Sequence, residues 1–575
     1  MSEVFMNRSF FFAGLALCAA IQAFGATYYV AVDGNDNDKG SKEKPFASLN
    51  KANAVVQPGD TVWIRGGVYD LNDTVYYKRY EMTAGILLTA SGESDDKRIY
   101  YFAYPGERPI FDGTNLPIGQ ACRNKGTIDS VMTTSPIVVA AKYLHLKGFE
   151  VRNTPMKCNS NSGIFLYASK HIILEQIDSH HNAGPGIFIH DGTSGGGGHL
   201  VLNCDAHDNY DPTGWQGDGE NADGFGVHYQ YDGDTTRFVG CRSWWNSDDG
   251  YDVLAQEFPV IVENSYAMGN GYIKYGTATP PGVNGHGFKM GYSRTGAGHH
   301  IIKNCVAWNN VANGFYSNYT NAGSTWINNT AYKNGDRSFG MASTTYDADL
   351  NRTADVMPLF GDNAHVLKNN IAIPNKNSQI GSCWMKDATH DVYVDCPTGE
   401  NNTWNLKLDL TEDDFVSLED PSMTVTGEDL SKIPGILGPR NPDGSVPDLD
   451  FLKLKEGSRA IDKGEDIGQS FVGAAPDLGA YEFGIIKSSS SIASSSSVAE
   501  SSSSEGSASI ITNVATFKVI SGEATVFDMQ GRYLGTLQLN QLHGETIQNA
   551  LLAKFKTPGI YLIRQGNRLH KVNVK

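Results

Sequence analysis

The chain has 575 residues and a formal net charge of −17, because 63 Asp and Glu outnumber 46 Lys and Arg. This acidic balance argues against a nucleic-acid-binding protein, since the phosphate groups would be repelled. It would also repel a polyanionic polysaccharide unless cations lay between the two. The 63 glycines and the scarcity of long amphipathic helical patterns predict an all-β fold.

The first 25 residues have the composition of a secretory signal peptide. Arg8 is followed by an apolar run over 10–20, and small residues end the segment at Gly25, just before Ala26. The apolar run is too short to be a convincing membrane span, and no other stretch of the sequence is suited to cross a bilayer. We therefore expect a secreted protein, extracellular or associated with the cell surface, without a membrane span.

Secondary-structure signals then appear in chain order. A helix is expected over 47–56, ahead of most strand signals, where it would cap an open end of the β structure. Alternating apolar and polar residues at 143–147 and 186–190 predict strands that are buried on one face.

A repeated Asn marks the architecture. It stands five places after a small or apolar residue, and its copies are Asn182, Asn209, Asn246, Asn270, Asn310 and Asn334. The shortest step between copies is 24 residues, which suits one coil of a parallel β-helix, and loops inserted within 209–224 and 270–287 account for the longer steps. We expect each Asn amide to bond to the Asn of the next coil, and each Asn to adopt the left-handed conformation of a turn.

Cysteines fit the same repeat. Cys204, Cys241 and Cys305 share one repeat position, which predicts an internal stack of small buried side chains. Export would also permit disulfides, and the candidate pairs are Cys122 with Cys158 and Cys383 with Cys396.

Four segments, at 221–226, 246–252, 284–289 and 310–316, share a Gly followed by an aromatic residue. Aligned on that Gly, Asp223 and Asp249 stand one place before it, Asp248 adjoins Asp249, and Asp252 and Lys289 stand two places after it. Equivalent positions of successive coils stack about 4.8 Å apart. We therefore expect four acids and one amine to lie in one small patch.

The residue types of this patch indicate its chemistry. Four neighbouring carboxylates do not all stay charged without a cation. An oxygen-rich set suits Ca²⁺ rather than Zn²⁺, so we expect Asp223, Asp248, Asp249 and Asp252 to bind calcium. Such an ion would attract an acidic sugar and acidify the proton beside its carboxylate, and Lys289 is the candidate base, provided that a nearby cation lowers its pKa. We therefore expect the reaction to be fastest at alkaline pH.

Each residue alone has a simpler explanation. A single Asp near Gly is most often a turn former, and a single Lys is most often solvated. His286 is in register with Asp223 and Asp249, and is compatible with packing or with sugar binding. Six aromatic residues could stack on sugar rings or belong to the core: Trp215, Trp244, Trp245, Tyr272, Tyr292 and Tyr316.

The segments Asn-Ala-Asp-Gly-Phe, Asn-Ser-Asp-Asp-Gly-Tyr-Asp and Gly-His-Gly-Phe-Lys, in this order, resemble those of pectate lyases of polysaccharide lyase family 9. The resemblance covers most of 26–484. It implies a right-handed parallel β-helix and calcium-dependent β-elimination of polygalacturonate, the backbone of pectin. It also implies Asp ligands and a lysine base, which correspond to Asp223, Asp248, Asp249, Asp252 and Lys289.

Two other functions remain open at this stage. Polygalacturonases are also right-handed β-helices with Asn-x-Asp, Asp-Asp and Gly-His-Gly segments, which 221–223, 248–249 and 285–287 resemble, but a hydrolase would leave Lys289 and Asp252 without a role. A non-catalytic adhesin or carbohydrate-binding β-helix would use the acidic cluster as a structural calcium site.

The domain organisation follows from composition. We expect a signal peptide over 1–25, a β-helix over 26–487, a flexible Ser-rich linker over 488–509 and a small basic β domain over 510–575. The last segment resembles C-terminal modules of secreted enzymes from fibre-degrading bacteria and sorting domains of bacterial secretion systems. It is therefore expected to be a small β-sandwich that serves export, surface retention or attachment. We expect the protein to be a monomer.

Overall fold

The computed structural model describes the following residues: 25–79, 82–117, 134–155, 161–190, 196–212, 218–230, 233–274, 277–278, 284–291, 298–341, 343, 345–346, 352–354, 363–373, 383–387, 392–395, 399–420, 436–484, 522–527, 533–539, 551, 554, 559–565 and 568–574. The signal peptide and the Ser-rich linker predicted above lie outside these residues. The predicted domain boundaries therefore stay predictions.

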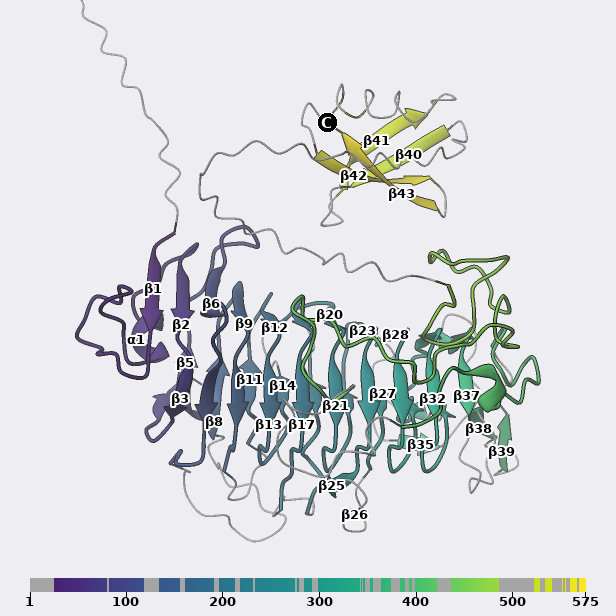
Figure 1. Cartoon of the computed structure of the whole chain (residues 1–575), viewed down its shortest axis with the longest axis horizontal. Coiled ribbons are helices and arrows are strands. Elements are labelled where there is room, and N and C mark those ends of the chain that lie inside the picture. Colours follow the sequence, from purple (N-terminus) through teal and green to yellow (C-terminus); the bar gives the residue numbers. More distant parts are fainter. Residues whose placement is uncertain are drawn as a thin grey trace, which may run out of the picture. The chain divides into compact units, whose positions relative to one another are not determined.

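Three long sheets form a parallel β-helix, and successive coils contribute one strand to each sheet (Figure 1). The first sheet comprises β1 (Thr27–Val30), β2 (Thr61–Ile64), β6 (Ile99–Ala103), β9 (Leu144–Lys147), β12 (Ile173–Glu175), β16 (Leu200–Leu202), β20 (Thr236–Val239), β23 (Val260–Glu263), β28 (Ile301–Lys303), β31 (Thr325–Ile327) and β36 (Val366–Lys368). The second sheet comprises β3 (Gly67–Asp70), β7 (Pro109–Asp112), β10 (Glu150–Arg152), β13 (Asp178–His180), β17 (Asp205–His207), β21 (Arg242–Trp244), β24 (Tyr266–Met268), β29 (Val306–Trp308), β32 (Thr330–Tyr332) and β37 (Ile371–Ile373).

The third sheet comprises β4 (Val75–Tyr77), β5 (Met82–Leu88), β8 (Thr134–Val139), β11 (Ile164–Tyr167), β14 (Ile187–His190), β18 (Phe225–His228), β22 (Tyr251–Leu254), β27 (Phe288–Gly291), β30 (Phe315–Tyr316), β33 (Phe339–Gly340), β38 (Cys383–Asp387) and β39 (Val392–Asp395). Its strands pair in parallel except at its two ends, where β4 with β5 and β38 with β39 are antiparallel. Three small pairs lie outside the long sheets: β15 (Gly196–Gly197) with β19 (Gly233–Asp234), β25 (Tyr272–Lys274) with β26 (Thr277–Ala278), and β34 (Thr345–Tyr346) with β35 (Arg352–Ala354). The predicted all-β parallel β-helix is confirmed.

A column of Asn side chains runs through the interior, as the sequence predicts. The Nδ2 atom of Asn209 donates to Oδ1 of Asn246 at 2.8 Å, and Asn246 and Asn270 donate in the same way to the next copy at 2.9 Å. The column begins at Asn182 and continues to Asn334. Buried amides are thereby satisfied from coil to coil.

The second role expected of this Asn is wrong, because the left-handed conformation belongs to the residue just before it. Positive φ angles between 51° and 55° occur at His181, Asp208, Trp245, Asn309 and Lys333. The backbone N–H of each Asn instead donates to the Oδ1 atom of the next Asn, as Asn246 does to Asn270 at 3.3 Å. Hydrogen bonding, rather than turn geometry, therefore accounts for the repeated Asn.

The repeated Gly and its aromatic neighbour fill the space beside this column. A Cβ atom on Gly250 would lie 2.7 Å from Nδ2 of Asn270, so only glycine allows the amide to approach. The following aromatic residues point inward and stack, with ring centroids 4.6 Å apart for Tyr251 and Phe288 and 5.0 Å apart for Phe288 and Phe315. The repeat is thus a packing unit.

Cys204, Cys241 and Cys305 are fully buried free thiols in the same core, which confirms the predicted internal stack. Both predicted disulfides involve residues outside the described part of the chain, and so they stay predictions.

A short helix covers one end of the β-helix, and a strap covers part of one sheet. At the β1 end, α1 (Leu49–Asn53) lies within the predicted helix but is shorter, and Leu49 and Ala52 are buried in the core (Figure 1). The short 3-10 helix η2 is Glu412–Asp414. A strap formed by 436–465 and 472–484 packs on the second sheet, where it covers Trp244 and Trp308.

The C-terminal segment contains a four-stranded antiparallel sheet in the order β41-β40-β42-β43. Its strands are β40 (Gly522–Phe527), β41 (Tyr533–Leu539), β42 (Gly559–Gln565) and β43 (Arg568–Val574). This unit is distinct from the β-helix. Among the described residues, no helix is both long and apolar enough to cross a membrane.

The Asn column predicts a large loss of stability when one amide is removed. In Asn270→Ala, the backbone N–H and Nδ2 of Asn246 lose the Oδ1 acceptor that they contact at 3.3 and 2.9 Å. Each buried donor left unsatisfied costs about 1–3 kcal/mol, so thermal unfolding should begin several degrees earlier. The exposed Asn37→Ala variant is the control, and equal melting of the two variants would contradict the structural role.

Candidate metal-binding and catalytic site

The third sheet places the predicted residues on its outer face. Asp252 is in β22 and Lys289 is in β27, and these two residues are direct partners in the parallel register. Gly226 precedes Asp252 in this column and Tyr316 follows Lys289. Equivalent repeat positions are therefore neighbours in space, as the sequence predicts.

The other three acids lie just before strands of the same sheet. Asp223 precedes β18 by two residues, and Asp248 and Asp249 precede β22. The backbone N–H of Asp249 donates to Oδ1 of Asp223 at 3.2 Å, which holds the two side chains in one stack. In the next coil, the N–H of His286 donates to Oδ1 of Asp249 at 2.6 Å. The loop before each strand thus repeats its geometry from coil to coil.

Lys289 joins the two groups of acids. Its Nζ atom lies 2.8 Å from Oδ2 of Asp249 and 3.4 Å from Oδ2 of Asp252. The lysine side chain is only 12% exposed, and those of Asp249 and Asp252 are 0% and 9% exposed. The amine is therefore held by carboxylates rather than solvated, and the interpretation of Lys289 as an ordinary surface lysine is wrong.

The geometry fits a cation. Asp223, Asp248 and Asp249 each offer an oxygen that lies within 4.8 Å of the other two. Oδ1 of Asp248 and Oδ1 of Asp252 are buried and have no hydrogen-bond partner within the described part of the chain. Buried carboxylate oxygens without donors are strongly destabilising unless a cation binds them. The all-oxygen donor set suits a hard ion such as Ca²⁺.

The pKa values show the electrostatic conflict in the ion-free protein. Burial raises the pKa of Asp223 and of Asp248 well above the usual value, and the neighbouring carboxylates raise both further. Burial also raises the pKa of Asp249, to about 6, although Lys289 opposes the shift. Burial acts against the charged form of Lys289, but the carboxylates around it outweigh burial and raise its pKa.

Asp252 is the exception among the acids. Burial acts to raise its pKa, but Lys289 and His228 more than offset burial and lower the pKa below the usual range. The Nε2 atom of His228 lies 3.3 Å from Oδ2 of Asp252. Asp223, His228 and Asp252 also form a second group of potential ligands whose atoms lie within 4.8 Å of one another.

His228 is a site residue that the sequence prediction missed. It follows Gly226 by two residues in β18, so it faces the same side of the sheet as Asp252 and Lys289. That alternation was a usable signal. Phe188 was missed as well, and its ring lies over Gly226, where an added Cβ atom would come within 2.7 Å of the ring.

His286 and the aromatic candidates for sugar stacking lie in different surroundings. His286 is buried, its ring stacks on Tyr316 at 4.3 Å, and its Nδ1 atom accepts from the N–H of Asn313 at 3.1 Å.

Trp244 and Trp245 are buried and pack under the strap, so the core interpretation holds for them. Tyr316 adjoins Lys289, Tyr272 lies in β25, and Trp215 and Tyr292 lie outside the described residues.

Comparisons with known proteins agree with this geometry. The family model described as "Pel9A-like, right handed beta helix region" matches residues 28–370. Pectate lyase L of Dickeya dadantii (strain 3937) is 32% identical over 456 residues, which cover 79% of this chain and 90% of that protein.

Two solved structures are also similar. Pectate lyase Pel9A has 29% sequence identity and a TM-score of 0.58, with 80% of this chain and 97% of that chain covered. A rhamnogalacturonan lyase has 26% identity and a TM-score of 0.60, with 75% of this chain and 97% of that chain covered. The predicted right-handed parallel β-helix is confirmed.

The raised pKa values predict how pH affects the ion-free protein. Because the pKa of Asp249 is higher in the folded state than the usual value near 3.9, folding favours the protonated acid, and this contribution to stability is lost as pH rises through about 6. The thermal midpoint of chelator-treated protein should fall between about pH 4 and 7 more steeply than that of Asp249→Asn. Saturating Ca²⁺ should remove the difference. Parallel pH profiles for the two chelated proteins would contradict this explanation.

Proposed function

Because this chain belongs to the family of Pel9A-like right-handed β-helix proteins, we propose that it is a pectate lyase that cleaves polygalacturonate by calcium-dependent β-elimination. The observation that carries the proposal is the contact of the Lys289 amine with a buried acidic cluster in which Oδ1 of Asp248 and Oδ1 of Asp252 lack a hydrogen-bond donor among the described residues. A base and a cation site are thereby held side by side on one rigid sheet.

The acidic cluster is proposed to bind Ca²⁺ through Asp223, Asp248, Asp249 and Asp252. When bound, the ion supplies positive charge that attracts the uronate carboxylate and stabilises the charge that develops beside it. His228 contacts Asp252 and limits the directions in which that carboxylate can turn. Asp223 belongs to one coil, and Asp248, Asp249 and Asp252 belong to the next. The site is rigid because strands β18 and β22 of these two coils are paired in a fixed register.

Lys289 is proposed as the base. Its Nζ atom takes the proton from the carbon next to the uronate carboxyl group, and the electron pair left behind forms a carbon–carbon double bond. The glycosidic carbon–oxygen bond breaks, and its oxygen leaves with the departing sugar and acquires a proton. Carboxylates keep Lys289 protonated in the ion-free protein. Deprotonation of Lys289 therefore requires that a bound cation neutralise these carboxylates. We expect turnover to be fastest at alkaline pH.

Polygalacturonate is proposed as the substrate because pectate lyase L matches across most of both chains. The similar rhamnogalacturonan lyase makes rhamnogalacturonan the comparison substrate. The side of the site toward the N-terminus is aromatic. Phe165 and Phe188 stack at 5.3 Å, and His190 lies against Tyr167 and Tyr229 at 5.5 and 5.2 Å. Such rings can pack against the apolar faces of sugars.

The role of Lys289 predicts a specific pattern among variants. Lys289→Ala and Lys289→Arg should each lower kcat on polygalacturonate by about 10²- to 10⁴-fold, because neither side chain can serve as the base. Calcium affinity, measured by calorimetry, should persist in both. The matched control is Lys303→Ala, which removes a lysine paired with Glu263 on the first sheet and should leave turnover unchanged.

Several outcomes would contradict this assignment. Substantial activity in Lys289→Arg would mean that the positive charge matters and the base does not. Saturated products with new reducing ends would mean hydrolysis, with the carboxylates as acid and base. Calcium binding without turnover on polygalacturonate or rhamnogalacturonan would favour a binding protein.

Secretion is proposed from the composition of 1–25, and surface retention or attachment from 510–575. Expression in a secreting bacterial host should release a protein whose N-terminus is Ala26, as read by mass spectrometry of the intact chain. Deletion of 510–575 should change its partition between cells and medium. An exported protein that retains Met1, or a deletion without effect on partition, would contradict the corresponding assignment.

A further inference from the structure

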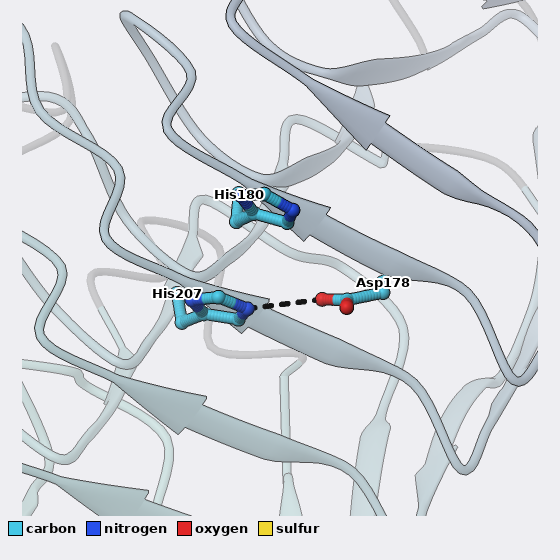
Figure 2. A group of neighbouring side chains, drawn as sticks. All are labelled: Asp178, His180 and His207. Carbon is cyan, nitrogen blue, oxygen red and sulfur yellow. Dashed lines mark hydrogen bonds and ion pairs between the residues drawn. The ribbon is translucent and has the colours of Figure 1, made fainter. Parts of the chain in front are cut away.

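A third group of potential metal ligands, Asp178, His180 and His207, lies on the outer face of the second sheet. Asp178 and His180 are two residues apart in β13, so both point to the same side, and His207 is the direct partner of His180 in β17 (Figure 2). The acidic site described above is built on the third sheet. The two groups are therefore separate.

The three side chains converge. The Nε2 atom of His207 lies 3.0 Å from Oδ1 of Asp178. The rings of His180 and His207 are nearly parallel, with centroids 4.7 Å apart. One donor atom from each of the three residues lies within 4.8 Å of the others. Ligands bonded to zinc at about 2.1 Å lie about 3.4 Å apart, so metal binding requires the two stacked rings to tilt toward one another.

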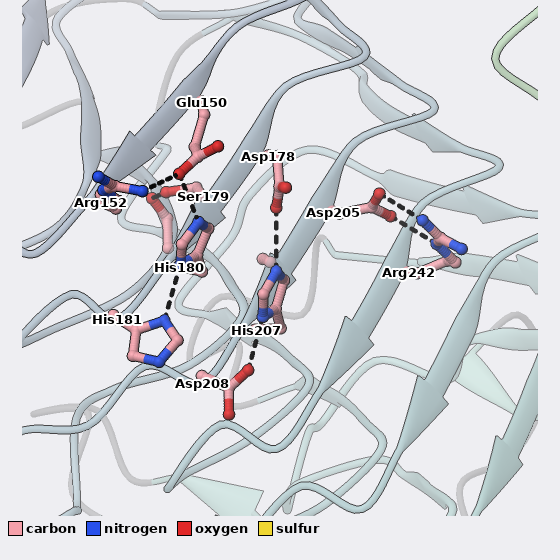
Figure 3. A network of polar contacts seen from close by, with 12 residues as sticks. Glu150, Arg152, Asp178, Ser179, His180, His181, Asp205, His207, Asp208 and Arg242 are labelled. Carbon is pink, nitrogen blue, oxygen red and sulfur yellow. Dashed lines mark hydrogen bonds and ion pairs between the residues drawn. The ribbon is translucent and has the colours of Figure 1, made fainter. Parts of the chain in front are cut away.

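Each histidine is also oriented from behind by a second partner (Figure 3). The Nδ1 atom of His207 lies 2.7 Å from Oδ2 of Asp208, and Nδ1 of His180 lies 2.7 Å from Nδ1 of His181. An imidazole that donates through Nδ1 presents the lone pair of Nε2 on its other side. Metal-binding histidines are typically held in this manner, by a carboxylate or another acceptor at the second nitrogen.

Two carboxylates adjoin the histidines, and arginines pair with both. Glu150 lies 3.0 Å from Nε2 of His180, on the side of Asp178, and contributes a further carboxylate. Arg108 bridges Glu150 and Asp178 at 2.6 and 3.0 Å, and Arg152 lies 3.0 Å from Glu150. A bound metal would take the place of Arg108, whose side chain is 56% exposed and can swing into solvent.

We propose that Asp178, His180 and His207 bind a divalent transition metal of the zinc class, with Glu150 as the nearest fourth ligand. Two imidazoles and a carboxylate suit Zn²⁺, Ni²⁺ or Cu²⁺, whereas the acidic site offers only oxygens of the kind that Ca²⁺ prefers. The metal binds through the lone pair of Nε2 on His207, and any proton on that atom passes to solvent. Because its ligands belong to β13 and β17, the metal ties two successive coils together.

The test is a calorimetric titration of Zn²⁺ into the full chain with Ca²⁺ in large excess, so that the acidic site is filled. We expect one Zn²⁺ per chain and a rise in the thermal midpoint. His207→Gln and His180→Gln should each weaken binding by at least about 100-fold, and Asp208→Asn by about 10- to 100-fold. The matched control is His145→Gln, since His145 has a carboxylate partner, Glu175 at 2.8 Å, and should keep the affinity of the unaltered chain.

Co²⁺ supplies an independent readout. Its visible absorption should show nitrogen ligation at low coordination number in the unaltered chain, and the histidine variants should lose that signal. Retained Zn²⁺ affinity in the double variant of His180 and His207, or no Zn²⁺ binding in excess Ca²⁺, would overturn the proposal. If His207→Gln fails to fold, the more exposed His180→Gln still gives a decisive answer. Turnover on polygalacturonate should not change in these variants, so a failure of the proposed lyase function would be separate from a failure here.

Discussion

A buried column of amide–amide hydrogen bonds holds the coils in register, and the rest of the molecule depends on that register. The spacing of about 4.8 Å between coils sets the distance between equivalent side chains. A slip of one residue would turn Asp252 and Lys289 from the outer face to the core and separate them from the acids that precede the strands. Stacking of Asn246 on Asn270 thus determines stability and site geometry together.

The same stacking brings like charges together, and the protein deals with them in two ways. On the second sheet, carboxylates alternate with cationic partners, so that Asp205 is met by both Arg242 and Arg440 at 2.6 Å. Among the described residues of the third sheet and the loops before its strands, the acids outnumber Lys289, which contacts two of them, and Asp248 keeps a buried oxygen without a donor. An unbalanced charge of this kind is costly for folding and is therefore a strong indication of function.

Repetition made much of this architecture predictable from the sequence. The fold and the cysteine stack follow from the repeated Asn, and the grouping of Asp223, Asp249, Asp252 and Lys289 follows from aligning coils on one Gly. The position of the left-handed residue was not predictable in this way, because His181, Asp208 and Trp245 share no residue type. Contacts across long stretches of sequence were also inaccessible, such as the binding of Arg440 to Asp205. His228 had a signal, its alternation with Gly226, but only once the strand was placed.

The most direct test of the central claim is the ultraviolet absorbance of the double bond conjugated to the uronate carboxylate, followed on polygalacturonate at alkaline pH. The account predicts a steady rise in the presence of Ca²⁺ that stops when a chelator is added in excess and resumes when Ca²⁺ is restored. Chain cleavage without that absorbance, or a rise that the chelator leaves unchanged, would contradict it.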